Sequence, residues 1–287
     1  MKNILVPIDF SPASNAASNF ASHLAKAFNS TVTLLHIIEA VDEGSFNIEG
    51  ETIASGSIED RLFNMKMIEK GKKQLAQAVV AMKENGVDTR SVLRVGDAYH
   101  GIRSIITAQK ADLVIMGTEG NSGIGHMFLG SNTEKIVRRA ACPVISVNRK
   151  TEYSPIKNIV WATSLKSEDM EIPAFLQELI TTAGVTVHLL RVNTPGTFLS
   201  DSVSKEKLKT IANFMKFKNH TINVYNDLEE TTGIIRFAAT VNADLIALST
   251  HGREGLAQLL SASIAENVIN HTRRPVMTYV IGGKENK

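Results

Sequence analysis

The chain contains an internal repeat, and this feature limits the possible folds more than any other. The segment KNILVPIDF from Lys2 aligns with KNIVWATSL from Lys157, an offset of 155 positions. The same offset brings TVTLLHII from Thr31 onto TVHLLRVN from Thr186 without a gap. A repeat of this length predicts two copies of one domain, and 287 residues are enough for two hydrophobic cores.

The two copies differ in length because one loop is longer in the first. ADLVIMGTEG from Ala111 aligns with ADLIALSTHG from Ala243 at an offset of 132 instead of 155, so the second copy is 23 residues shorter. The difference falls on residues 41–57, which are rich in Gly, Ser and Glu and typical of a surface loop. We therefore expect copy one at residues 1–148 and copy two at residues 156–282, joined by a polar linker.

Each copy alternates short β-branched runs with helical patterns, which is typical of βαβ units and a parallel sheet. The expected strands of copy one are almost continuously apolar, as in strands that helices cover on both faces. They are ILVPI, TVTLLHII, TRSVLRV, DLVIMG and PVISV. Helical spacing predicts four helices between them, of which the second has an apolar stripe from Leu62 through Met65 to Met82 and ends near Gly86. The sequence therefore predicts an α/β fold.

The composition and charge exclude several classes of protein. The 31 Lys and Arg residues against 29 Asp and Glu give a net charge of +2, which leaves no basic excess for binding nucleic acid or an anionic membrane. The single cysteine, Cys142, cannot close an internal disulfide, which is typical of a reducing compartment. Asp9 stands where a signal peptide would still be apolar, and no apolar run approaches the roughly 18 residues of a membrane span. We expect a cytoplasmic protein without nucleic-acid or membrane partners.

Two strand ends in copy one carry residues that are typical of ligand sites. In an open parallel sheet, ligands bind beyond the carboxyl ends of the strands, where the strand order reverses. Asp9 follows the first strand, and its carboxylate can accept hydrogen bonds from a ribose or an amine; the alternative is a helix N-cap together with Ser11. After the fourth strand, Gly117 and Gly120 allow close backbone approach, and Gly130 opens a helix whose N–H groups favour an anion. These positions predict a phosphate-binding site.

The residues V-P-I-D-F-S after the first strand and M-G-x-x-G-x9-G-S after the fourth resemble the universal stress protein family in its tandem form. The resemblance covers nearly the whole chain. It implies two Rossmann-like domains, each a five-stranded parallel sheet of order 3-2-1-4-5 flanked by helices, and a role in the stress response. In members with the complete glycine motif, it also implies binding of ATP, or of ADP or AMP, with or without Mg²⁺.

Carried over position by position, the resemblance implies a nucleotide site in copy one. The set is Pro7, Ile8 and Asp9 beside the adenine and ribose, Ile37 at the adenine edge, Met116, Gly117 and Gly120 along the ribose and phosphates, and Gly130, Ser131 and Asn132 as donors to the phosphates. Glu119 is acidic and residues 121–129 contain no Lys or Arg. We therefore expect weak or Mg²⁺-dependent ATP binding, or a preference for AMP or ADP.

Copy two departs from this pattern at the decisive positions. The replacements are Asp9 by Ser164, Gly117 by Ser249 and Gly130 by Ala262. Alanine at a position of positive φ, or where a phosphate must approach closely, disfavours the same ligand pose. We therefore expect copy two to be a structural partner, with residues 250–253 forming a solvated loop.

No catalytic arrangement is recognisable in either copy. The chain has no G-x-S-x-G, no H-E-x-x-H and no Cys/His metal spacing, so we expect no catalytic residue, no protein-held metal and at most incidental ATPase activity. Two functions remain. One is a nucleotide-dependent stress regulator recognised by another protein; the other is a scaffold with vestigial pockets that recruits a partner through residues 41–57 or through the shortened face of copy two. The retained Asp9 and glycines favour the first.

The last strand of each copy predicts how the copies associate. Such a strand is a sheet edge with unpaired N–H and C=O groups, so PVISV of copy one can pair with PVMTYV of copy two. The linker at residues 148–155 spans at most about 29 Å, which is sufficient for a neighbouring domain. We expect an internal pseudo-dimer with an approximate twofold axis, monomeric or weakly homodimeric in solution.

Overall fold

The computed structural model describes residues 1–39, 58–118, 130–165, 172–182, 184–251 and 257–281. Copy one contains β1 (Asn3–Pro7), α1 (Pro12–Phe28), β2 (Thr31–Ile38), α2 (Ile58–Glu84), β3 (Thr89–Val95), α3 (Ala98–Ala108), β4 (Leu113–Gly117), α4 (Ser131–Arg139) and β5 (Val144–Val147). Copy two contains β6 (Asn158–Ala162), α5 (Ala174–Thr182), β7 (Thr186–Asn193), α6 (Asp201–Met215), β8 (His220–Asn226), α7 (Glu230–Thr240), β9 (Leu245–His251), α8 (Ala257–His271) and β10 (Val276–Ile281).

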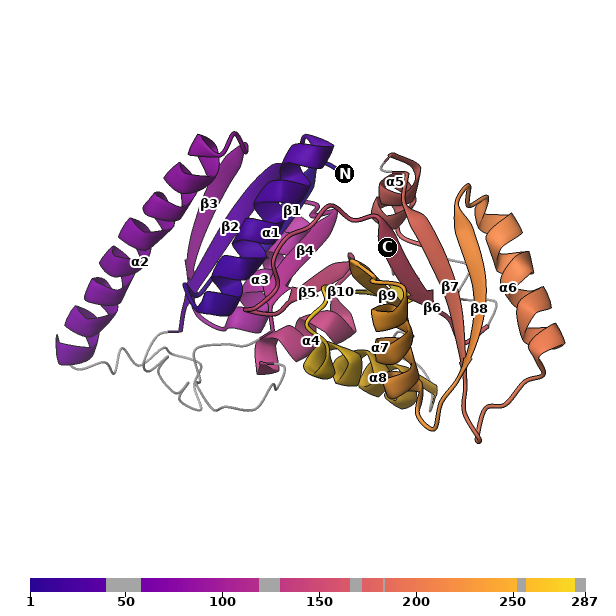
Figure 1. Cartoon of the computed structure of the whole chain (residues 1–287). Coiled ribbons are helices and arrows are strands. Elements are labelled where there is room, and N and C mark those ends of the chain that lie inside the picture. Colours follow the sequence, from indigo (N-terminus) through magenta and orange to yellow (C-terminus); the bar gives the residue numbers. More distant parts are fainter. Residues whose placement is uncertain (40–57, 119–129, 166–171, 183, 252–256, 282–287) are drawn as a thin grey trace.

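The strands of both copies form one continuous sheet (Figure 1). Its order is β3-β2-β1-β4-β5-β10-β9-β6-β7-β8. Neighbouring strands are parallel within each copy, whereas β5 and β10 pair antiparallel. The α/β fold with two repeated domains, predicted from the sequence, is confirmed.

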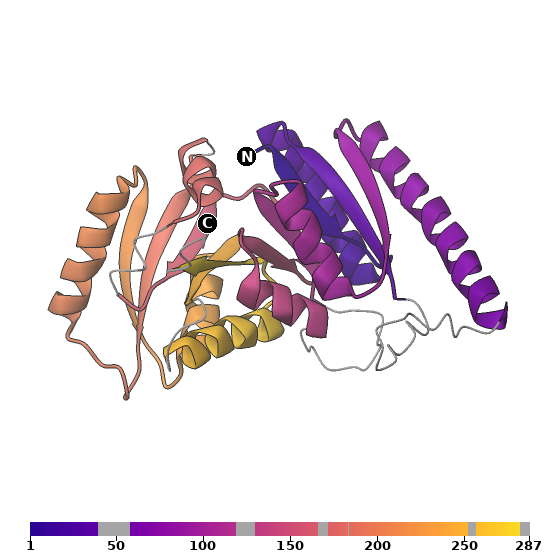
Figure 2. The same cartoon turned by 180° about the vertical axis from the view of Figure 1, so that it is seen from behind.

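Helices cover both faces of the sheet, and each face holds a core that extends across both copies. Helices α1, α2, α5 and α6 pack on one face, and α3, α4, α7 and α8 pack on the other. Figure 1 shows α1 in front of the strands, and Figure 2 shows α3 in front after the half turn. Strand side chains alternate between the two cores, with Ile4 and Val6 in the first and Leu5 in the second.

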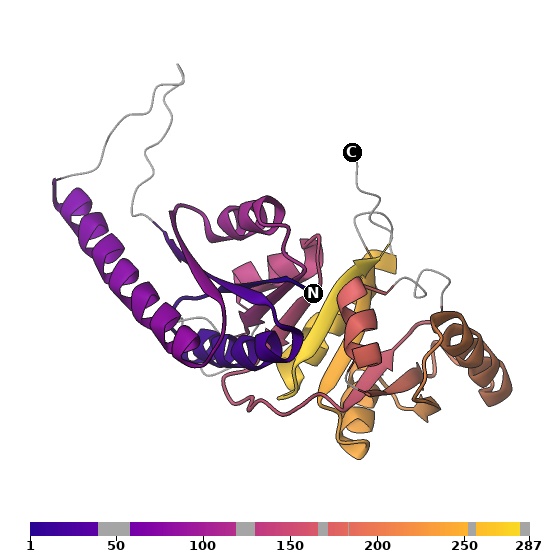
Figure 3. The same cartoon turned by 90° about the horizontal axis from the view of Figure 1, so that it is seen from above.

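Helix α2 is longer than the part of the sheet that it covers. Its C-terminal half buries Leu75 and Met82, whereas Leu62 and Met65 are 52% and 66% exposed. Seen from above, the start of the helix extends away from the rest of copy one (Figure 3). The predicted helix is therefore present and is followed by Gly86 with a φ of +75°, but only the second half of its apolar stripe is buried.

The junction between the copies has local twofold symmetry. The antiparallel register places Ile145 opposite Met277. These two residues occupy equivalent positions of the repeat, because their numbers differ by the offset of 132. The pseudo-twofold axis therefore passes through this pair, and both side chains are 0% exposed. The pairing of the two last strands, expected from the sequence, is present.

Aromatic side chains extend the junction on the α1 face. Phe28, at the end of α1, meets Phe175 of α5 edge-on, with the ring centroids 5.9 Å apart. Tyr153 of the linker lies edge-on to Phe20 at 5.4 Å and stacks on His23 at 4.4 Å. The linker is therefore packed against copy one rather than being a free tether.

One cation on the opposite face joins the two copies. Arg138 of α4 donates to Glu266 of α8 through Nε and through Nη2, the latter at 2.9 Å, and Nη2 also lies 3.1 Å from Glu134. Glu266 is the repeat equivalent of Glu134, whereas the equivalent of Arg138 is Asn270. The contact therefore exists on only one side of the axis.

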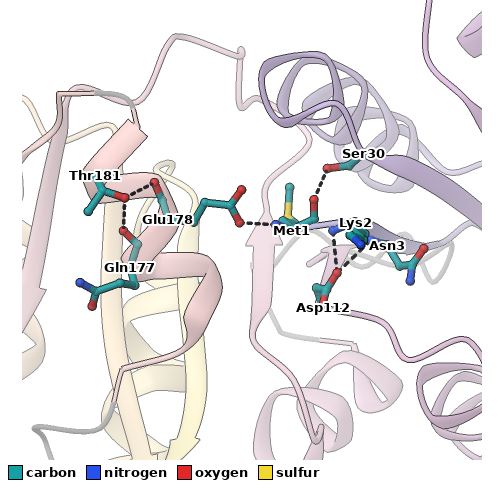
Figure 4. A network of polar contacts seen from close by, with 8 residues as sticks. All are labelled: Met1, Lys2, Asn3, Ser30, Asp112, Gln177, Glu178 and Thr181. Carbon is teal, nitrogen blue, oxygen red and sulfur yellow. Dashed lines mark hydrogen bonds and ion pairs between the residues drawn. The ribbon is translucent and has the colours of Figure 1, made fainter.

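Figure 4 shows polar contacts near the start of β1. The Met1 amino group contacts Glu178 of α5, which links the copies again. Asp112 accepts two backbone hydrogen bonds at the start of β1, at 2.7 and 3.0 Å. Asp244, its repeat equivalent, accepts the same two bonds at the start of β6, at 2.9 Å each. The two copies thus share these hydrogen bonds as well as their topology.

Within the described residues, no helix has the length and apolarity needed to cross a membrane.

Candidate functional site

A cavity of about 670 Å³ lies at the carboxyl ends of β1, β2 and β4 in copy one. Nine of the ten predicted site residues line it, namely Pro7, Ile8, Asp9, Ile37, Met116, Gly117, Gly130, Ser131 and Asn132. The tenth, Gly120, lies outside the described residues, as do Glu119 and residues 121–129. Positions more than 100 residues apart in the sequence therefore meet around one space.

The backbone turns sharply after β1, and this turn directs Asp9 toward the cavity. Phe10 has a φ of +62°, and its repeat equivalent, Leu165, has +67°, so the strained turn belongs to the fold of both copies. Ser11, not Asp9, caps α1 by accepting the N–H of Ser14 at 3.2 Å. Asp9 accepts the N–H of Ser11 through Oδ1 at 3.0 Å, and its side chain is exposed at the cavity.

The end of β2 forms the wall beside Ile37. His36 Nδ1 lies 2.7 Å from the carbonyl oxygen of Ile8. A carbonyl oxygen only accepts, so Nδ1 carries a hydrogen and donates it to Ile8. The ring of Phe10 packs against His36, with the centroids 4.7 Å apart. The position of the imidazole is therefore fixed from two sides.

The N-terminus of α4 faces the cavity and has no side-chain cap. The N–H of Gly130 donates to the Thr118 carbonyl at 3.1 Å, so in this structure it already has an acceptor. The first-turn N–H groups of Ser131 and Asn132 face the same end of the helix. The φ of Gly130 is −58°, which any residue can adopt, so a side chain at this position would not be strained by a positive φ.

Gly117 lies against the backbone of α1. A Cβ at this position would come 2.6 Å from the Ala13 carbonyl carbon and 2.8 Å from the Ser14 nitrogen. Glycine is therefore required for the helix to approach β4, independently of any ligand. In copy two the corresponding helix begins at Ala174, which is equivalent to position 19, and Ser249 occupies the glycine position.

Helix α2 supplies a wall that the sequence analysis missed. Met67, Lys70, Gly71 and Gln74 line the cavity from successive turns of this helix. Lys70 is the one Lys or Arg among the described lining residues. These residues lie three, four and seven positions after Met67, a spacing that places them on one face of a helix and that can be recognised in the sequence. Which face of α2 turns inward is decided by the burial of its C-terminal half.

Copy two has a smaller cavity of about 70 Å³ at the equivalent place. Each residue that lines it is equivalent, at the offset of 155 or 132, to a residue that lines the cavity of copy one. The polar character has changed, with Ser164 in place of Asp9, Arg191 in place of His36, Glu230 in place of Ala98 and Ile264 in place of Asn132.

The helix beside the copy-two cavity also begins earlier. Helix α8 starts at Ala257, which is equivalent to position 125, whereas α4 starts at Ser131. Ser263 and Ile264 therefore lie beyond the first turn, where N–H groups are used within the helix. Copy two presents no helix N-terminus to its cavity at the positions where copy one does.

Neither metal nor thiol chemistry is indicated by the described part of the chain. Among those residues, no three His, Cys, Asp or Glu side chains are grouped so that they could hold a metal ion. Burial, with a smaller contribution from Asp112, raises the pKa of Cys142 to about 12. The thiol is therefore protonated at neutral pH, whereas nucleophilic chemistry requires the thiolate.

The repeat and the fold have counterparts in known proteins. The family model described as universal stress protein family matches residues 1–148 and again residues 155–279. The chain belongs to the universal stress protein family. A universal stress protein of Synechocystis sp., Slr1230, is 24% identical over 97% of this chain and 100% of its own length.

Other universal stress proteins match one copy or the whole fold. A universal stress protein of Thermus aquaticus is 31% identical over 51% of this chain and 98% of its own length. The crystal structure of a universal stress protein from Archaeoglobus fulgidus covers 96% of this chain and 97% of its own, with a TM-score of 0.74 and 16% identity. The tandem arrangement is therefore an architecture that this family uses elsewhere.

Proposed function

We propose that this universal stress protein binds one adenine nucleotide per chain, in the copy-one cavity, and acts as a nucleotide-dependent regulator in the stress response. One observation carries the proposal. Residues from the ends of three strands and from the start of α4 line a single cavity, which brings the Asp9 carboxylate and an uncapped helix N-terminus to the same space. Carboxylates accept from ribose hydroxyls, and helix N-termini favour phosphates.

The lining residues fit the three parts of a nucleotide. Ile8, Ile37 and Met116 offer apolar surface for adenine, and Asp9 offers an acceptor for the ribose. The N–H groups of α4 would bind the phosphates, with the charge of Lys70 nearby. Lys70 supplies positive charge that residues 121–129 lack, which favours ATP or ADP over AMP. Mg²⁺, where present, would be carried by the phosphates.

The proposal extends to what the nucleotide does. The occupied copy one would be recognised by a protein partner in the cytoplasm, and ATP hydrolysis would be incidental. A scaffold without nucleotide is less well supported, because copy one retains a cavity of about 670 Å³ whereas that of copy two is about 70 Å³.

Titration calorimetry is expected to find one ATP site per chain. Asp9→Ala should weaken ATP and adenosine alike, by about tenfold or more, because the lost acceptor serves the nucleoside. Ser164→Ala, at the equivalent position of copy two, is the matched control and should leave ATP affinity unchanged. Two equivalent sites would contradict the proposal, and a loss limited to ATP would contradict the ribose role of Asp9.

Ser131→Pro is expected to weaken ATP by about tenfold to a hundredfold and to leave adenosine binding unchanged. Proline removes one backbone donor but is favoured at the first position of a helix. Gly130, with φ −58° and ψ 144°, already has the conformation preferred before proline. Asp201→Pro makes the same change at the start of α6, where Ser200 has φ −60° and ψ 150°. If Ser131→Pro bound ATP as tightly as this control, α4 would not be the phosphate site.

A further inference from the structure

The cavity of copy two contains a buried arginine that has few partners. Arg191 of β7 lines this cavity and is 6% exposed. Its Nη2 donates to the carbonyl oxygen of Thr197 at 2.8 Å, whereas its buried Nε has no hydrogen-bond partner within the described chain. A guanidinium has five N–H donors and a full positive charge, and burying it beside one neutral acceptor is unfavourable. Within the described residues, no carboxylate accepts a hydrogen bond from this guanidinium.

Bracing the neighbouring loop does not account for this arginine. Asn193, two residues further along β7, already holds that loop. Its side-chain amide donates to the Leu199 carbonyl at 2.9 Å, and its Oδ1 accepts the N–H of Leu199 at 3.4 Å. The bond from Arg191 to Thr197 uses a single donor, so the rest of the guanidinium is available for another role.

The remaining lining is mostly apolar, with one acidic side chain. Leu190, Ile234 and Leu248 are buried around the cavity. Glu230, at the start of α7, also lines it and accepts from the Thr197 hydroxyl at 3.4 Å. Thr197 therefore contacts both charged residues, with its carbonyl on the arginine and its hydroxyl on the glutamate. One positive and one negative side chain disfavour a dianion, while the buried guanidinium still favours a single negative charge.

We propose that the copy-two cavity binds a small monocarboxylate with a short apolar tail, held by Arg191. The planar guanidinium matches the two oxygens of a carboxylate, and the apolar side chains match the tail. The cavity of about 70 Å³ corresponds to about two water molecules at roughly 30 Å³ each, which excludes a nucleotide and limits the tail of the acid to a few carbon atoms. The site is independent of the nucleotide proposal, because it uses residues of copy two alone.

The test is a titration of the full chain with isobutyrate, followed by NMR of the methyl groups. Saturable shifts are expected at the methyl groups of Val192, Ile234 and Leu248, with a Kd of about 1 mM. Arg191→Met keeps most of the side-chain volume without the charge and should weaken binding at least tenfold. Arg103→Met, an exposed arginine of α3, is the matched control and should bind like the unaltered chain.

A second variant tests whether binding needs the space of the cavity in addition to the charge of Arg191. Ile264→Phe retains Arg191 but fills the space, and it should abolish the isobutyrate shifts. Fluorescence of the buried Trp161 shows whether each variant is folded. Inorganic phosphate should not compete with isobutyrate.

Several outcomes would overturn the proposal. They are unsaturable shifts at tens of millimolar isobutyrate, equal affinity in Arg191→Met, or tighter binding of inorganic phosphate. ATP titrated into the same samples reports on copy one, so failure of the carboxylate site and failure of the nucleotide site give different results.

Discussion

Gly117→Ala is expected to lower the free energy of unfolding by about 3 kcal/mol and to abolish nucleotide binding. The added Cβ would lie 2.6 Å from the carbonyl carbon of Ala13, well inside the closest approach that Cβ atoms make. The atom that it meets belongs to the backbone of α1, so no side chain can rotate away. Helix α1 would have to move off β4, and Asp9 and Ser11 would move with it. Urea unfolding followed by circular dichroism measures the first effect, and ATP titration measures the second.

The matched control for this substitution is Gly196→Ala. A Cβ at Gly196 would have no atom within 4 Å, and this glycine has no positive φ that a side chain would strain. Its unfolding midpoint should stay within experimental error of the unaltered chain. Equal midpoints for the two variants would mean that the close contact between β4 and α1 does not limit this position.

Ile145→Asp is expected to destabilise copy two although the substitution lies in copy one. The side chain is 0% exposed and lies opposite Met277 on the pseudo-twofold axis. A carboxylate at this place is buried without a partner, which costs several kcal/mol. Because the sheet is continuous through β5 and β10, we expect the substitution to destabilise the packing of copy two as well as that of copy one. Trp161, the single tryptophan, is buried in copy two and reports its unfolding there by fluorescence.

The measurement is the urea midpoint of the Trp161 transition. It should fall clearly in Ile145→Asp and coincide with the circular dichroism transition of the whole chain. Val95→Asp is the matched control, since it introduces the same charge in copy one on β3, where the side chain is 49% exposed. An unchanged Trp161 midpoint in Ile145→Asp would mean that the two copies unfold independently.

Much of this architecture could be predicted from the sequence, because the same pattern of strands and helices occurs in both copies. Matching strand segments at fixed offsets predicted two α/β copies, and the apolar last strands predicted their pairing. The site followed from elementary sheet geometry, because the carboxyl ends of β1 and β4 are neighbours in a parallel sheet. Asp9, Gly117 and Gly130 could thus be expected at one edge of the sheet, and all three line the copy-one cavity.

The missing parts depend on tertiary packing. The sequence spacing of Met67, Lys70 and Gln74 defines one helix face, but the cavity receives that face only because Leu75 and Met82 fix the rotation of α2. The early start of α8 has no simple signal, since Ala257 lacks a cap motif before it. The hydrogen bond from the Gly130 N–H to the Thr118 carbonyl also has no sequence signal. It engages an N–H group that was predicted to donate to a phosphate.

The one-sided contact of Arg138 shows what a single chain permits that a pair of identical chains does not. In a homodimer every substitution occurs on both sides of the axis, so a change that suits one side must be tolerated by the other. Here the second side carries Asn270, and the two halves have been free to differ. The same freedom allows Asp9 in one cavity and Arg191 in the other. Because both copies lie in one chain, their two cavities can carry different side chains while the same sheet supports both.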